Sequence, residues 1–339
     1  MIHFLLRRLA FALISLWALI TIVFLMIAVI PGDQAKIAAG EGASPEMIEQ
    51  ARQRLGLDQP LIVQYVRYLM RLVQGDLGTS TSTFQPIADN LRDAFPSTLE
   101  LVLLSMVTVV IFGVSIALLV VANKGGFIDG TVRVVAIAAA GMPLFWTAFM
   151  LQLGLAAGQA IPISGVLSTQ YVVPKITGLL LVDSLLSGQP DAFGDAFLHL
   201  LLPVFVLALP QTVVIIRTLR TSMLNEMHEE YILMARSKGA STGRILIRHA
   251  LPNAIVPMVT VLGLQVGYML SGAVIIESIV ARPGVGAYLT SSVLQKDTFA
   301  VLGTVLFIGA IVLLVSLLVD LFQLAIDPRV RRGMVTRSS

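Results

Sequence analysis

The chain contains no cysteine and unusually few charged residues. Without cysteine it has no disulfide framework, no thiolate zinc site and no cysteine nucleophile. Only 13% of its 339 residues are charged and 56% are hydrophobic, whereas soluble domains carry about 25% charged residues. So few charges cannot cover a soluble globule of this size, and the apolar content excludes a disordered chain. The composition predicts an all-α membrane protein.

The motifs of several enzyme and carrier classes are also missing. The sequence has no G-x-x-x-x-G-K-[ST] run to bind ATP phosphates and no H-E-x-x-H zinc motif, and its four histidines are far apart. The Gly284-Val285-Gly286 triplet lacks the third glycine of a dinucleotide site. We therefore predict no catalytic residue, no metal ligand and no nucleotide site on this chain. An intramembrane enzyme is disfavoured for the same reason.

Six apolar stretches are long enough to cross a bilayer, which requires about 20 residues. The first exceeds the apolar core of a secretory signal peptide, so it is expected to be a retained anchor. The central parts of all six are uncharged, which disfavours an ion-coupled secondary carrier without excluding it. The stretches are Leu9–Ile30, Leu101–Asn123, Val134–Gly158, Phe197–Ile216, Ala250–Ile276 and Thr298–Val319.

The distribution of Lys and Arg predicts the orientation. Outside the long segment 31–97, most of these residues fall on the side that holds both termini, so both termini are predicted to be cytoplasmic. The predicted organisation is a first unit 1–30, an extracytoplasmic region 31–97, a five-helix core 98–327 and a cytoplasmic tail 328–339. The core includes an outer loop 159–197, with a short interfacial piece at 176–186, and a cytoplasmic loop 217–253. Two amphipathic helices are expected within 31–97, at 45–52 and 61–73.

The loop 217–253 is too charged to enter lipid and too long to be a simple turn. Met227, Tyr231, Met234 and Ala235 follow helical spacing, which predicts a helix of ~13 residues and ~20 Å. Gly239 is expected to end this helix in a left-handed conformation. Ser241 or Thr242 would cap a second short helix that Pro252 terminates. The pattern predicts a helical knob for a partner, or alternatively a helix lying on the membrane.

Residues in this loop resemble the coupling motif of bacterial ATP-binding-cassette importer permeases. The matching segments are Tyr231-x-x-x-Ala235-Arg236-x-Lys238-Gly239 and His249-Ala250-Leu251-Pro252-Asn253. The form is most similar to the first permease subunit of the dipeptide/oligopeptide/nickel branch. Further segments agree along the chain, and Val280-Ala281-Arg282 departs from the usual Phe-x-Trp. The other matches are Pro31-Gly32-Asp33, Leu55–Pro60, Gly75–Gly78, Pro96–Leu101, Pro143–Trp146, Pro283–Gly286, the 177–203 region, Asp320 and Asp327-Pro328-Arg329.

The resemblance implies a six-helix, type I importer fold in the bacterial inner membrane. It implies a second homologous permease, two ATPase subunits that bind ATP and Mg, an extracytoplasmic solute-binding protein, the lipid bilayer as surroundings and no nucleic acid. Substrates would be di- or oligopeptides, with nickel, glutathione or another small solute as alternatives. Tyr231 and Ala235 would enter the ATPase groove. The coupling residues would be Tyr231, Met234, Ala235, Arg236, Lys238, Gly239, His249, Pro252 and Asn253.

Small residues in the fifth apolar stretch predict close helix packing. Gly263, Gly267 and Ser271 fall on one stripe of that helix, where the absence of large side chains lets a neighbouring backbone approach.

Overall fold

The protein is represented by a computed structural model that describes residues 2–29, 34–40, 42–55, 57–158 and 161–326. Within these residues the regular structure is helical, apart from one isolated bridge between Thr79 and Pro86. The all-α prediction is therefore confirmed. The predicted tail 328–339 and the segments Pro31-Gly32-Asp33 and Asp327-Pro328-Arg329 lie outside the described residues.

Five helices are long and apolar enough to cross a membrane, and a bent helix pair brings the number to six if it counts as one span. The five are α1 (Ile2–Val29), α5 (Ile87–Ala122), α9 (Pro190–Glu226), α12 (Leu251–Ile279) and α14 (Thr298–Ile326), and the pair is α6 (Phe127–Gly141) and α7 (Leu144–Ala156). The shorter elements are α2 (Gln34–Ala39), α3 (Pro45–Leu55), α4 (Leu61–Val73), α8 (Leu180–Leu186), α10 (Glu230–Ser237), α11 (Thr242–Ile245), the π-helix η1 (Leu246–Ala250) and α13 (Val285–Leu294).

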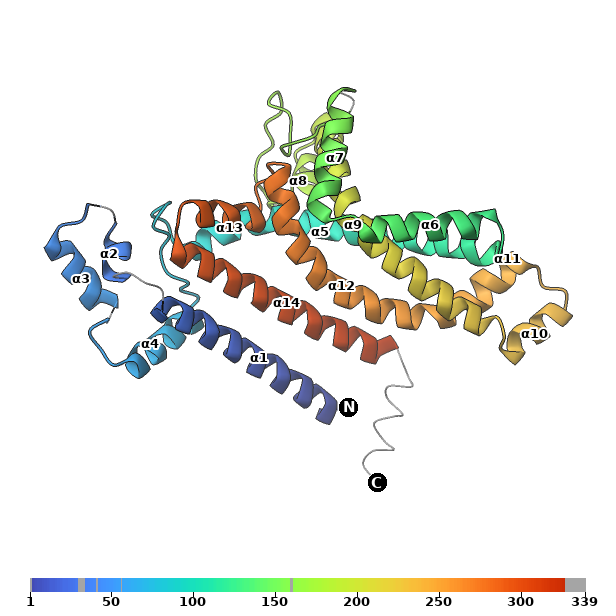
Figure 1. Ribbon diagram of the computed structural model, residues 1–339, viewed down its shortest axis with the longest axis horizontal. Coiled ribbons are helices and arrows are strands. Elements are labelled where there is room, and N and C mark those ends of the chain that lie inside the picture. Colours follow the sequence, from blue (N-terminus) through green and yellow to red (C-terminus); the bar gives the residue numbers. More distant parts are fainter. Residues whose placement is uncertain (1, 30–33, 41, 56, 159–160, 327–339) are drawn as a thin grey trace.

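The third predicted span is not a continuous helix. α6 and α7 meet at 107°, and α7 points away from the layer formed by the long helices (Figure 1). The break falls at Met142, which is extended at φ −85° and ψ 123°. Pro143 disfavours the helical conformation for the residue before it, so the chain turns here. The span predicted over Val134–Gly158 is therefore formed by two helices that meet at a bend.

The core of the molecule is centred on α9. This helix packs along α5 and α12, and Val206, Ile215 and Leu219 on it are fully buried. Pro203 and Pro210 lie inside α9 without ending it. α1 lies at the periphery against α14 and exposes most of its apolar side chains.

α1 and α14 run antiparallel at this edge. The Arg8 guanidinium contacts the Asp320 carboxylate at 2.9 Å, joining the start of α1 to the last turns of α14. Both helix ends lie toward the same end of the molecule as α10 (Figure 1). This is the arrangement expected if the two termini are on one side of the membrane.

Close packing of α12 on α14 occurs at two of the three small residues named above. A Cβ on Gly263 would overlap the Val319 side chain, and one on Gly267 would lie 3.6 Å from Val312. Ser271 is exposed, and its hydroxyl donates to the Gly267 carbonyl at 3.1 Å. The stripe therefore brings α12 near α14 at the glycines only.

The Gly263 contact predicts the effect of a larger side chain. Gly263→Leu should lower the free energy of unfolding by ~1–3 kcal/mol, because overpacking displaces Val319 and α14. Thermal unfolding of the purified chain in detergent measures this as a lower midpoint. Gly154→Leu is the matched control, since no atom lies within 4 Å of a Cβ at Gly154. Equal losses in the two variants would contradict the packing argument.

Candidate functional site

The α9–α12 loop, residues 227–250, forms a projection at one end of the molecule (Figure 1). It begins with a turn after Glu226 and continues as α10, which has eight residues and spans about 12 Å. The predicted helix of ~13 residues was too long. Glu229 adopts an extended conformation, with φ −72° and ψ 146°, so α10 starts one turn later than the spacing indicates.

Gly239 ends α10 as the sequence predicts. Its φ is +80°, a value that favours glycine. The Ala240 amide donates to the Ala235 carbonyl at 3.1 Å, and the Gly239 amide donates to the Arg236 carbonyl at 3.0 Å. This is the Schellman pattern of helix termination, and it turns the chain toward α11.

Pro252 does not end a helix, in contrast to the prediction. α11, η1 and α12 are successive parts of one helical run from Thr242 to Ile279, and Pro252 lies in the first turn of α12. A proline inside a helix lacks an N–H and collides with the carbonyl four residues earlier. The wider π-turn of η1 lies just before Pro252 and opens the backbone at that carbonyl.

Tyr231 joins three helices at the base of the loop. Its hydroxyl contacts the Glu226 carboxylate at the end of α9 and accepts from Asn253 Nδ2 of α12 at 2.9 Å. Asn253 Nδ2 also donates to the His249 carbonyl at 3.1 Å. Burial and the hydrogen bond to Glu226 both raise the pKa of Tyr231, so the phenol keeps its proton. The Tyr231 hydroxyl therefore links α10 to both α9 and α12.

The side chains of α10 differ in exposure. Ile232 is fully buried, and Ala235 is partly buried against the neighbouring core. Met234 is 61% exposed, Leu233 52% and Tyr231 39%. Arg236 and Lys238 are also exposed. Leu233 and Met234 are thus the most exposed apolar side chains of α10, and the entry of Tyr231 and Ala235 into a partner's groove stays a prediction.

The loop between α7 and α9, predicted above to be an outer loop, contains two aspartates that accept several hydrogen bonds. Asp183 accepts from the Thr177 hydroxyl at 2.6 Å and from the Gly178 amide at 2.9 Å. Burial would raise the pKa of Asp183, but its hydrogen bonds outweigh burial and lower it. Asp195 accepts from the Ser168 amide and hydroxyl, both at 2.7 Å. The loop is thus an ordered surface.

A buried ionic cluster, which sequence reasoning missed, lies at the end of the bundle away from α10. Glu277 is fully buried at the end of α12 and accepts from the Thr98 hydroxyl at 2.6 Å and the Gly286 amide at 2.7 Å. Arg282 is 1% exposed and contacts Glu100 at 2.7 Å. Glu100 and Glu277 lie at the ends of uncharged stretches, and Glu100 is far from Glu277 and Arg282 in the sequence, so no local pattern indicates that these groups meet.

The same cluster organises the neighbouring elements. Glu100 also accepts from the Leu181 amide of α8 at 2.8 Å, so one carboxylate joins α5, α8 and the turn after α12. Ala281 in that turn has a φ of 51°, which costs about 1–2 kcal/mol for a residue with a Cβ. Two of the segments that resemble the permease family, Pro96–Leu101 and Pro283–Gly286, meet at this cluster. Their shared resemblance is the sequence signal that could have indicated it.

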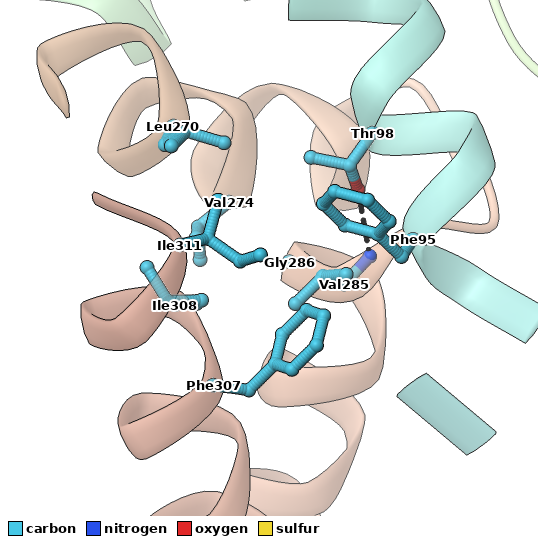
Figure 2. Close-up of a pocket in the computed structure, with 9 residues that line it drawn as sticks. All are labelled: Phe95, Thr98, Leu270, Val274, Val285, Gly286, Phe307, Ile308 and Ile311. Atoms are coloured by element: carbon cyan, nitrogen blue, oxygen red, sulfur yellow. Dashed lines mark hydrogen bonds between the residues drawn. The ribbon is translucent and has the colours of Figure 1, made fainter. Parts of the chain in front are cut away.

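A small pocket beside the cluster is apolar. Figure 2 shows Phe95, Leu270, Val274, Phe307 and Ile311 around it, with the Val285 amide donating to Thr98 Oγ1 at 2.9 Å. Apart from Thr98 its lining has no polar side chain. Among the described residues, no three His, Asp or Glu side chains come together to hold a metal ion.

Comparison with known proteins decides the family. The family model described as "Binding-protein-dependent transport system inner membrane component" matches residues 91–332, and its N-terminal companion, "Binding-prot-dependent transport system membrane comp, N-term", matches residues 1–102. The chain belongs to this family. It is therefore a multi-pass inner-membrane permease, and members of the family transport solutes rather than act as enzymes.

Several curated permeases match nearly the whole chain. The "Probable D,D-dipeptide transport system permease protein DdpB" of Escherichia coli K12 is 39% identical, over 94% of this chain and 96% of its own. The "Di/tripeptide transport system permease protein DppB" of Pseudomonas aeruginosa is 37% identical, over 98% and 99%. The "Glutathione transport system permease protein GsiC" of E. coli is 31% identical, over 98% and 99%.

The ionic cluster yields a test of its energetic role in this permease. Glu100→Gln should destabilise the chain by ~3–5 kcal/mol, because it leaves the buried Arg282 charge without its counterion. Thermal unfolding in detergent reports the loss. Combining Glu100→Leu with Arg282→Met should recover most of it, because no buried charge remains unpaired between these positions.

The control is the exposed pair of Glu49 and Arg52, whose closest atoms lie 3.5 Å apart. Glu49→Gln should leave the unfolding midpoint unchanged, because exposed ion pairs contribute little. If Glu100→Gln is equally silent, the buried pair does not stabilise the fold.

Proposed function

We propose that the chain is one of two homologous permease subunits through which an ATP-driven importer passes di- and oligopeptides. The observation that carries the proposal is full-length similarity to permeases named for dipeptide transport. The relative named for glutathione transport is less similar, so glutathione is the alternative solute. Nickel and other small solutes are further alternatives, and so is ion-coupled transport. An uptake assay distinguishes among them.

The other functions of the proposed importer would belong to partner subunits. Two ATPase subunits would bind ATP and Mg, and an extracytoplasmic binding protein would deliver the peptide to the outer loops. This chain would bind no cofactor and no nucleic acid and would not hydrolyse ATP. The ATPases would hold α10 through exposed Leu233 and Met234, and Tyr231 would pass their closure to α9 and α12.

The proposed coupling site contains the residues predicted from the sequence, and we assign them two roles: contact with the ATPase and support of the loop. Met234, Arg236 and Lys238 would meet the partner through their exposed side chains, whereas Tyr231, although 39% exposed, would anchor the loop through its hydrogen bonds. The others would shape or anchor the loop. These are Tyr231, Ala235, Gly239, His249, Pro252 and Asn253.

We further propose that both termini and the α9–α12 loop are cytoplasmic, which would place α2 to α4 and the outer loop outside. Single cysteines can test this without background, because the chain has none of its own. Gln74→Cys and Gln295→Cys, both at exposed positions, should react with an impermeant thiol reagent in whole cells. Ser241→Cys, also exposed, should react only after the cells are opened. Labelling of Ser241→Cys alone in intact cells would reverse the orientation.

Uptake by cells tests the function and the coupling together. Cells without this gene should lose uptake of a labelled dipeptide, and the wild-type chain should restore it. Met234→Glu should fail to restore it although the chain reaches the membrane in normal amount, because a carboxylate would be carried into an apolar contact.

Glu229→Gln at an exposed position beside α10 is the control and should restore uptake fully. If cells without this gene lose uptake of glutathione or nickel and keep uptake of the dipeptide, then glutathione or nickel is the solute and the peptide proposal is wrong. Normal dipeptide uptake with Met234→Glu would exclude this side of α10 as the ATPase contact.

A further inference from the structure

The helix α4 leaves an apolar side uncovered. Ile62 is 78% exposed, Val66 42%, Met70 59% and Val73 90%. At 3.6 residues per turn these four side chains lie on one side of the helix. Exposed apolar groups in such an array mark a contact surface, and the importer function proposed above does not use it.

A second side of α4 is attached to α1 through aromatic residues. The Tyr65 and Thr21 hydroxyls are 2.7 Å apart. The Phe24 ring centroid lies 5.1 Å from that of Tyr65 and 5.7 Å from that of Tyr68. Figure 1 shows α4 at the C-terminal end of α1. These contacts fix the height of α4 along a membrane-spanning helix.

That height corresponds to the edge of the hydrocarbon. The apolar span of α1 runs from Leu6 to Met26, so Thr21 lies about 7–8 Å before its end at 1.5 Å per residue. Amphipathic helices that lie in a membrane surface bury their apolar side by about 5–10 Å. The attachment of α4 to α1 therefore places it at the depth of such helices.

The third side of α4 is basic. Arg67 and Arg71 are one turn apart and are separated around the helix from the stripe of Ile62, Val66, Met70 and Val73. A helix with one apolar and one basic side suits the boundary between acyl chains and lipid phosphates. On α1, Ile22 and Leu25 follow the α4-contacting Thr21 and Phe24 in the sequence and are themselves exposed.

We propose that α4 lies in the plane of the membrane, with its apolar side among the lipid acyl chains and Arg67 and Arg71 at the phosphates. Its partner is the lipid leaflet on that side and not a protein. The continuity with the lipid-facing residues of α1 favours lipid, because a protein docked on α4 would have to displace lipid from both helices. The inference does not depend on the solute that the permease carries.

Site-directed spin labelling of the full chain in phosphatidylcholine vesicles tests the proposal. A label at Met70→Cys should collide several-fold more often with oxygen than with a water-soluble nickel chelate, and its depth should be about 5–10 Å. Arg67→Cys on the same helix is the matched control and should favour the chelate. Ile14→Cys in the middle of α1 and Gln74→Cys beyond α4 give the lipid and water references.

Each other outcome contradicts the proposal. A Met70→Cys label that behaves like the one at Gln74 would place the apolar side in water. A label shielded from both reagents would show that protein covers this side of α4. Equal lipid exposure at Met70 and Arg67 would place the whole helix below the interface.

Discussion

The buried ion pair of Glu100 and Arg282, with the buried carboxyl group of Glu277 beside it, is the constraint on which one end of the bundle depends. Ionised groups in an apolar interior are costly unless each finds hydrogen bonds and an opposite charge. Here the partners come from α5, α8, the turn after α12 and the start of α13. Separating these elements would leave the Glu100 or Arg282 charge unpaired in apolar surroundings, so the ion pair favours their staying together as one unit. The strained conformation of Ala281 is tolerated because this unit holds the turn on both sides.

The other end of the molecule is built differently. There α10 is short and projects from the bundle, and its attachment is the hydrogen-bonded group around Tyr231. Asp129 at the start of α6 receives two hydrogen bonds from Arg220 of α9, at 3.0 and 3.2 Å, so α9 is held at this end as well. The two ends of the bundle are therefore held by different contacts, an ion pair at one end and hydrogen bonds around a small projection at the other. In the proposed importer, a partner that shifts α10 would act on α9 and α12 through Tyr231.

Local sequence patterns were sufficient to predict most of the membrane spans. They were insufficient where contacts with neighbouring helices determine the backbone conformation. The positions of α9, α12 and α14 follow from uncharged runs, because a hydrophobic helix can be recognised from its own residues. α9 extends beyond its run, Phe197–Ile216, to Pro190 and Glu226. The bend at Met142, the short α10 and the passage of the helix through Pro252 do not follow from such runs. In each case a proline or an extended residue acts together with the packing of adjacent helices. Ala235 shows the same limit: helical spacing places it on a side with Tyr231, but Ala235 is partly buried against the core whereas Tyr231 is 39% exposed.

The sequence by itself determined the class of molecule, its membrane location, the position of Gly239 and the family. Each of these depends on composition, on short spacing or on motifs in order along the chain. Only the tertiary structure decided that Thr98 meets Glu277, 179 positions away, and that α4 lies against α1. It also decided that Met234 rather than Ala235 is presented outward. Such contacts depend on how helices that are distant in the sequence pack against each other. The local hydrophobic pattern does not show which polar groups this packing brings together.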